Sequence, residues 1–253
     1  MPEPPPLQGA PESLYEQGYS LDPASAALYA RWRALGAAGK AEHVIGLCAR
    51  AGIRPASTLE IGCGDGALLC ELRRRGFGGR LAGVEISSAA VAIASRRSEI
   101  DAVERYDGAR LPAADGAYDL GVLSHVLEHV ADPVALLREA ARASRAVVVE
   151  VPLEANLSAR RAQKRSHAEQ IGHLQQLDRS GARAIVARAG LSIAGELEDP
   201  LPLRAQLFFA ASSPARAAAA ARWAVRAGLH GSVPALARRL FTVHYACLCL
   251  PDG

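Results

Sequence analysis

Three alternating glycines follow a short apolar segment of the chain. Residues 58–69 contain Glu60, then Gly62, Cys63, Gly64 and Gly66, and a segment with helical character comes next. Glycines let the backbone turn tightly and approach a ligand without interference from a Cβ atom, and the start of a helix presents free N–H groups. The G-x-G-x-G spacing differs from the dinucleotide pattern G-x-G-x-x-G, and Glu60 would repel a pyrophosphate. The loop therefore indicates a ligand that carries a positive group at this point, more than a phosphate.

Acidic residues also lie at the ends of the next two apolar segments. Glu85 is placed where a carboxylate binds ribose hydroxyls in a parallel sheet, and Ile86 can pack against a base. Asp107 and Gly108 together offer an acceptor and a backbone donor, which suits the edge of an adenine ring. Each feature alone has an ordinary interpretation, such as a turn glycine, a solvated glutamate or an Asx-turn. Their order at successive strand ends favours one nucleoside-binding site.

Alternating strands and helices must position these residues. A helix is expected over residues 21–51, with Asp22 as its N-cap, and further helices are expected over 67–75, 88–97, 133–143 and 178–189. Strands are expected over 58–61, 81–85, 102–106, 118–124, 146–151, 191–197 and 242–250. Strands that alternate with helices of this length predict repeated right-handed βαβ units and a parallel sheet, which is an α/β fold.

Four segments resemble the successive motifs of class I S-adenosylmethionine-dependent methyltransferases. They are LEIGCGDG, GVEIS, DGARLPAADGAYDL and SHVLEHVADP, and the resemblance covers about residues 40–200. It is strongest to the small-molecule branch that includes the ubiquinone/menaquinone methyltransferases. The resemblance implies a Rossmann-like, seven-stranded, mostly parallel sheet with helices on both faces and an antiparallel last strand. It also implies S-adenosylmethionine as the cofactor.

The resemblance implies a role for each residue singled out above. The glycine loop with Glu60 would line the methionine end of the cofactor, and Glu85 would hold the ribose. Asp107 and Gly108 would contact the edge of the adenine ring. Two residues of the fourth motif would border the methyl group. The implied cofactor-binding residues are Glu60, Gly62, Cys63, Gly64, Glu85, Ile86, Asp107, Gly108, Ser124 and His125. The N-terminal arm around Tyr15 and Tyr19 corresponds in position to the segment that often covers the cofactor in relatives.

The candidate catalytic residues are His125, Glu128 and His129. Methyl transfer is an in-line displacement for which the protein mainly supplies position. A base is needed only if the nucleophile must lose a proton, and His125 is the first choice by its position. The same residues spell H-x-x-E-H, a metal-binding pattern of some hydrolases, in which Glu196 or Glu198 would complete the site. The related methyltransferases show Leu-Glu-His here without metal, so no metal is expected.

The remainder of the chain suggests attachments to a single large domain. Residues 1–39 are expected to form an N-terminal arm and helix, and 40–253 the methyltransferase domain. Helical insertions are expected at 153–177 and 214–240. The first contains basic residues near the substrate entrance. The second holds five arginines and no acidic residue, and it would act as a lid or a homodimer contact.

Composition limits the location and the partners of the protein. The formal net charge of +3 is mild, and the motifs of nucleic-acid methyltransferases are missing, so a nucleic-acid substrate is disfavoured. Five cysteines in no disulfide-like pattern favour a reducing compartment. The apolar run 241–250 is too short to span a bilayer, and residues 1–9 differ from a signal peptide. We expect a soluble cytoplasmic protein without stable membrane insertion.

Together these observations predict an enzyme that transfers a methyl group from S-adenosylmethionine to an O, N or C nucleophile of a small molecule, in specialised metabolism. One alternative is an NAD(P)-dependent oxidoreductase on a similar fold, although the glycine spacing and Glu60 speak against it. The other alternative is a catalytically silent binding protein that keeps the fold.

Overall fold

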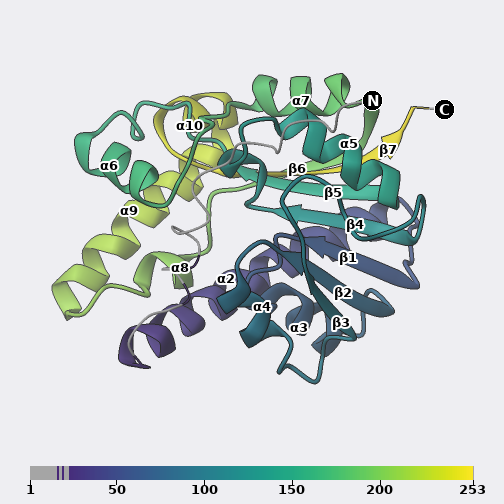
Figure 1. Cartoon of the computed structure of the whole chain (residues 1–253). Helices are drawn as coiled ribbons and strands as arrows, with labels where there is room; N and C mark the ends of the chain where they lie inside the picture. The colour runs from purple at the N-terminus through teal and green to yellow at the C-terminus, as the bar shows by residue number, and fades with distance from the viewer. Residues whose placement is uncertain (1–15, 17–18, 20–22, 253) are drawn as a thin grey trace.

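The computed structural model describes residues 16, 19 and 23–252, and over these the chain forms a seven-stranded sheet with helices on both faces (Figure 1). The strand order is β3-β2-β1-β4-β5-β7-β6. β7 pairs antiparallel with β5 and with β6, and the other strand pairs are parallel. The predicted Rossmann-like sheet with an antiparallel last strand is therefore confirmed.

The strands lie within two residues of their predicted bounds. They are β1 Ser57–Ile61, β2 Arg80–Glu85, β3 Ala102–Arg105, β4 Tyr118–Ser124, β5 Ser144–Pro152, β6 Leu191–Asp199 and β7 His244–Pro251. Because β7 runs against β5, its first residue is opposite the last residue of β5, as the pairing of Pro152 with His244 shows. The ends of β1, β2, β4 and β5 and the start of β7 therefore meet at one side of the sheet, which we call the carboxyl edge.

The helices are α2 Pro23–Arg50, α3 Ala67–Arg74, α4 Ser88–Ala94, α5 Pro133–Ala143, α6 Ala162–Gln170, α7 Arg179–Arg188, α8 Leu203–Leu207, α9 Ser213–Ser232 and α10 Pro234–Leu240, with a short 3₁₀ turn η1 at Leu127–His129. Local chemistry sets several of their starts. Asp132 and Asp178 accept hydrogen bonds from the first turns of α5 and α7, as N-cap residues do. The expected cap at Asp22 lies outside the described residues. α2 runs without a break across residue 39, so the expected boundary there falls inside a helix.

Two hydrophobic cores hold the helices to the two faces of the sheet. On one face, Leu136 of α5 and Val186 of α7 join a cluster with Val147 of the central strands. On the other face, Val44 of α2 and Leu69 of α3 pack with buried residues of β4, β5 and β7. Figure 1 shows α5 and α7 above the sheet and α2, α3 and α4 below it. Among the described residues, no helix is both long enough and apolar enough to cross a membrane.

The first insertion is less helical than predicted. Only Ala162–Gln170 is a helix, whereas we expected one throughout 153–177. Asn156 explains part of the difference, because its amide donates to the Leu153 carbonyl and its Oδ1 accepts from the Ala159 backbone. These bonds fold the segment after β5 into a turn instead of a helix.

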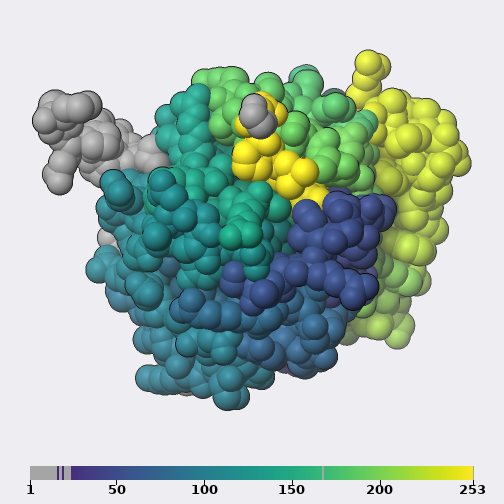
Figure 2. All heavy atoms as spheres, turned by 90° about the vertical axis from the view of Figure 1, so that its right-hand side faces the viewer, coloured from purple at the N-terminus to yellow at the C-terminus, as the bar shows by residue number. Residues whose placement is uncertain are grey.

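The second insertion consists of two helices, α9 and α10, which are separate because Pro234 begins a new one. The short helix α8 precedes the insertion and is not among the predicted elements. The backbone N–H groups of Leu157 and Ser158 donate to the carbonyl oxygens of Arg239 and Leu240. The two insertions are thus tied to each other beyond the carboxyl edge. Figure 2 shows the second one, in yellow-green, along one flank of the molecule.

Candidate active site

The glycine loop joins β1 to α3 at the carboxyl edge. The backbone N–H groups of Gly62 and Cys63 donate to the carbonyl oxygen of Val84, at 2.8 and 3.1 Å. Gly62 and Gly64 have φ angles of 72° and 55°, in the left-handed region that favours glycine. A Cβ atom at Gly64 would collide with the hydroxyl group of Tyr19. The loop is therefore anchored to β2 and must lack a side chain where Tyr19 approaches it.

The side chain of Cys63 points away from the loop. It is 5% exposed, and a Cβ atom at Gly83 of β2 would lie 2.6 Å from its sulfur. Burial raises the pKa of the Cys63 thiol well above its usual value. Any contact of Cys63 with a ligand would have to use its backbone.

Glu60 is a buried acid at the base of the loop. Its side chain is 5% exposed, and its Oε2 has no hydrogen-bond partner within the described part of the chain. Burial raises the pKa of Glu60 to about 8, with the charge of Lys40 acting in the opposite direction and those of Asp65 and Glu85 raising it further. An unpaired buried carboxylate is costly. A cation bound beside it would remove that cost.

Glu85 ends β2 next to the loop, as predicted. Its Oε2 accepts from the Gly64 N–H at 2.9 Å, and its Oε1 accepts from the N–H groups of Ile86 and Ser87 at 2.8 and 3.1 Å. These bonds fix the carboxylate at the strand end. Ile86 lies beside Gly108, because a Cβ atom there would be 3.6 Å from its Cγ2. The expected ribose and adenine residues are therefore neighbours.

Asp107 lies two residues beyond the end of β3 and is exposed. Its Oδ1 accepts from the backbone N–H groups of Arg110 and Ala109, at 2.9 and 2.8 Å. These bonds lower the pKa of Asp107 and make an Asx-turn. The turn is the ordinary interpretation of this pair, and the predicted contact with adenine stays a prediction.

Ser124 and His125 mark the end of β4. The Ser124 hydroxyl is buried and has no hydrogen-bond partner in the residues described. His125 has a φ of 60°, and its ring lies between two buried acids, with Nδ1 3.1 Å from Glu128 and Nε2 3.6 Å from Glu150. Burial and the charge of Lys40 lower the pKa of His125, but the ion-pair contacts with the two acids outweigh them and raise it.

Glu128 and His129 follow on the 3₁₀ turn. Glu128 is 1% exposed; burial would raise its pKa, but the bond with His125 lowers it. The Nδ1 of His129 is 3.2 Å from the Gly172 carbonyl, and its ring meets that of His173 edge-on, with 4.7 Å between centroids. The three predicted catalytic residues thus lie together at the carboxyl edge, in contact with the first insertion.

The hydrolase-like metal site considered from the sequence does not form. The left-handed φ of His125 and the 3₁₀ turn keep His125 and His129 off one helix face, and their donor atoms fall in separate groups. The two acids expected to complete that site are engaged elsewhere. Glu196 pairs with Arg179 and Tyr245, and Glu198 pairs with Arg238 and His230.

The described part of the N-terminal arm covers the loop, whereas Tyr15 lies outside the described residues. The Glu16 carboxylate accepts from the Ser88 and Ala89 N–H groups at the start of α4. Tyr19 stacks on the Arg33 guanidinium, 4.8 Å from its ring centre. A cavity of about 280 Å³ lies between this arm, α2 and α4. The arm therefore helps to enclose the side of the glycine loop.

A family model described as a methyltransferase domain matches residues 29–195. The match spans more than half of the chain and includes the glycine loop, Glu85, Asp107 and His125. The chain belongs to this methyltransferase family. The predicted resemblance is confirmed, and members of the family use S-adenosylmethionine.

The methyltransferase also resembles solved structures. A geranyl diphosphate C-methyltransferase from Streptomyces coelicolor A3(2), in complex with Mg²⁺, geranyl diphosphate and S-adenosyl-L-homocysteine, is 17% identical, with a TM-score of 0.57 over 78% of this chain and 72% of that one. A possible histamine N-methyltransferase from Thermotoga maritima is 19% identical, with a TM-score of 0.53 over 67% of this chain and 78% of that one. At these identities the likeness shows the shared fold.

One curated relative is an uncharacterized 37.1 kDa protein in transposon TN4556 of Streptomyces fradiae. It is 40% identical over 93 residues, which are 35% of the methyltransferase. The aligned part is 27% of the relative's length, so the methyltransferase matches about a quarter of that protein.

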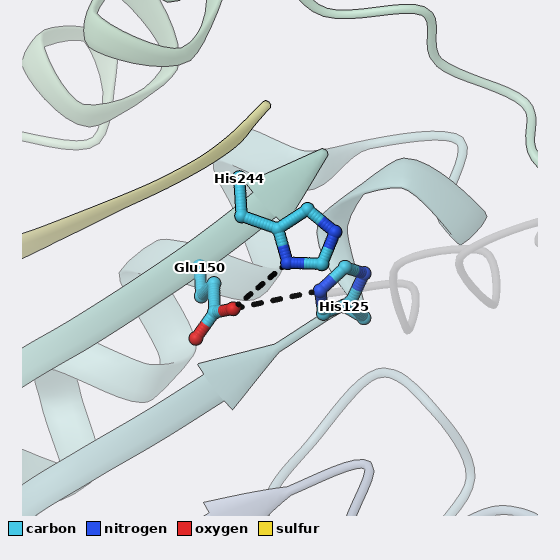
Figure 3. A group of neighbouring side chains, drawn as sticks. All are labelled: His125, Glu150 and His244. Atoms are coloured by element: carbon cyan, nitrogen blue, oxygen red, sulfur yellow. Dashed lines mark ion pairs between the residues drawn. The ribbon is translucent and has the colours of Figure 1, made fainter. Parts of the chain in front are cut away.

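Three residues around His125 were not predicted from the sequence. Glu150 near the end of β5 and His244 at the start of β7 lie beside His125 (Figure 3). His43 on α2 contacts the other oxygen of Glu150. Glu150 is the one acid in an apolar strand, and His244 is a polar residue in the apolar run of residues 241–250. Both were visible as single exceptions to an apolar pattern, but only the sheet order brings them together.

Proposed function

We propose that this methyltransferase transfers the methyl group of S-adenosylmethionine to an oxygen, nitrogen or carbon nucleophile of a small molecule, in specialised metabolism. The observation that carries the proposal is Glu60, a buried carboxyl group under the glycine loop with one oxygen that no described residue bonds. The methionine end of S-adenosylmethionine carries an ammonium group, which would offset that charge. Gly62 and Gly64 turn the backbone there through left-handed φ angles that favour glycine.

The remaining cofactor contacts follow the order of the strands. Glu85 would hold the ribose hydroxyls, since its carboxylate already sits fixed at the end of β2. Ile86 and Gly108 would face the adenine, with Asp107 at its edge. Ser124 and His125, at the end of β4, would border the methyl group.

When bound, the cofactor supplies a methyl group on a sulfonium centre, which a nucleophile can displace. The protein's task is then to position the acceptor and, where the acceptor must lose a proton, to accept it. We assign this to His125 because it ends β4. Glu128 orients the His125 ring through its Nδ1, and His129 holds the adjoining turn against Gly172.

The surroundings of the carboxyl edge favour a small acceptor. The two insertions are joined by backbone hydrogen bonds from Leu157 to Arg239 and from Ser158 to Leu240, so they form one wall beside the site. A formal net charge of +3 gives little attraction for a nucleic acid. Exposed Phe209, Val225 and Leu236 on this wall suit a lid or a homodimer contact, and light scattering in solution distinguishes these roles.

Calorimetric titration with S-adenosylmethionine tests the proposal. We expect binding by the unaltered chain and a loss on the order of 10- to 100-fold in affinity for Glu85→Gln, because charge-assisted hydrogen bonds to the ribose would be weakened. Glu104→Gln, an exposed acid on the neighbouring β3, serves as the matched control and should bind like the unaltered chain. Circular dichroism confirms that each variant is folded.

Two results would contradict the proposal. Binding of NAD(P)H in place of S-adenosylmethionine would favour the oxidoreductase alternative. The chain is also incubated with S-adenosylmethionine and a broad panel of acceptors, and the products are analysed by mass spectrometry. If the chain binds S-adenosylmethionine but no acceptor gains the mass of one methylene group, the silent binding protein is favoured.

A further inference from the structure

Glu150 is a buried acid surrounded by three histidines. It is 1% exposed. His244 Nδ1 and His125 Nε2 lie 3.3 and 3.6 Å from its Oε1, and His43 Nδ1 lies 3.3 Å from its Oε2. Figure 3 shows the rings of His125 and His244 turned toward the carboxylate. None of these contacts has hydrogen-bond geometry, so both oxygens of Glu150 and Nε2 of His125 lack a hydrogen-bond partner in the described chain.

Ion pairs with three histidines surround this buried carboxylate without an aligned hydrogen bond, and an ion bound among the same atoms would satisfy the carboxylate and the imidazole nitrogens together. The spacing of the donors supports it. Zinc binds imidazole nitrogen and carboxylate oxygen at about 2.0–2.2 Å in a tetrahedron, so two such ligands are about 3.3 Å apart. The separations of 3.3 and 3.6 Å from Glu150 match this value, and all three donor atoms lie within 4.8 Å of one another.

Partners outside this trio orient the donors. The Nδ1 of His125 is 3.1 Å from Glu128, which directs its Nε2 toward Glu150. The second oxygen of Glu150 faces His43, whose Nε2 is in turn 3.2 Å from Asp199. Metal-binding histidines usually have a carboxylate or carbonyl on the other ring nitrogen. Of the two histidines of the trio, His125 has this arrangement.

We propose that His125, Glu150 and His244 bind a divalent transition-metal ion, with Zn²⁺ the best fit. The three ligands come from the ends of β4 and β5 and the start of β7. Because zinc in a tetrahedral site has four ligands, the fourth position is left for an exogenous group. This assignment replaces the expectation of a metal-free site.

A role in catalysis rests on the proposed function. An ion at this edge would bind an acceptor hydroxyl and stabilise its deprotonated form, the proton leaving to solvent. His125 would then act on the acceptor through the ion instead of taking the proton itself.

The experiment measures metal binding by the full chain. Protein stripped with EDTA is titrated with Zn²⁺ in calorimetry, and metal content after dialysis is measured by mass spectrometry. We expect one equivalent of Zn²⁺ per chain, and a tetrahedral absorption spectrum with Co²⁺. The five cysteines are buried, so thiol binding at the surface does not compete.

Variants assign the ligands. His244→Gln and Glu150→Gln should each reduce the affinity for Zn²⁺ by at least 100-fold, and His43→Gln, an outer partner, by about 10- to 100-fold. His230→Gln is the control, because His230 pairs with Glu198 and belongs to neither group of donor atoms. If Glu150→Gln fails to fold, His244→Gln decides alone.

A second set of possible metal ligands lies next to this cluster, and it provides the result that would contradict the proposal most clearly. Glu128, His129 and His173 also bring donor atoms within 4.8 Å. Loss of Zn²⁺ binding in His173→Gln but not in His244→Gln would overturn the proposal, as would the absence of Zn²⁺ binding by the unaltered chain. Titration of the stripped protein with S-adenosylmethionine is independent, so failure of the metal site and failure of the proposed function are distinguishable.

Discussion

Glu60 is an acid that burial keeps protonated near neutral pH in the cofactor-free chain. Its pKa of about 8 exceeds the usual 4.5. The folded chain therefore retains a proton that the unfolded chain loses above pH 4.5. The stability associated with this group is complete below pH 4.5 and is lost as the pH rises through 8.

Replacing this carboxyl by an amide should remove that pH dependence. We expect Glu60→Gln to be close to the unaltered chain in unfolding free energy at pH 4.5, and more stable by on the order of a few kcal/mol at pH 9. Urea unfolding without cofactor measures the difference, with exposed Glu104→Gln as the control. A difference that is constant across this pH range would show that Glu60 is charged throughout.

The glycine loop packs closely against Gly83 of β2, and this contact requires that Gly83 has no side chain. A Cβ atom at Gly83 would lie 2.6 Å from the Cys63 sulfur and 3.1 Å from Leu69 of α3. We expect Gly83→Ala to destabilise the chain by about 1–3 kcal/mol and to weaken S-adenosylmethionine binding. Thermal unfolding and calorimetry measure these effects.

The matched control lies in α2. Gly39 is within this helix, and a Cβ atom there would have no neighbour within 4 Å. Gly39→Ala should therefore stabilise the chain by about 0.5–1 kcal/mol. If both alanine variants shift stability in the same direction, the steric argument for Gly83 is wrong.

For the whole molecule, ligand binding should appear as added stability. S-Adenosylmethionine at about 100 times its dissociation constant should add about 2.7 kcal/mol, which raises the melting temperature of a chain of this size by about 5–10 °C. Scanning calorimetry of the unaltered chain and of Glu85→Gln at the same ligand concentration tests this. An equal rise in both would place the ligand away from the end of β2.

Much of this architecture could be predicted from local patterns. α5 has the predicted bounds because Asp132 and Pro133 define its start and an apolar face defines its length. The positions of Glu60 and Glu85 in the strands could also be predicted, since both belong to short apolar segments with a local strand pattern. Glu60 lies near the end of β1 and Glu85 ends β2, and their contacts with the cofactor stay a prediction.

The residues that could not be predicted depend on the packing of distant segments. Glu150 and His244 meet because β7 enters between β5 and β6, and no local pattern records that order. The insertion after β5 was misjudged because the side chain of Asn156 competes with helical hydrogen bonds. Both errors come from side chains whose partners are set by the fold and not by their neighbours in sequence.

The position of β7 between β5 and β6 also has a consequence for biosynthesis. All of α6 to α10 is translated after β5 and before β7, so a nascent chain emerges from the ribosome with the β5 edge exposed for that whole interval. An exposed edge of this kind invites pairing with other chains. Because the late strand also carries His244, the cluster at Glu150 is assembled only when translation has passed that strand, and no shorter nascent form can hold it.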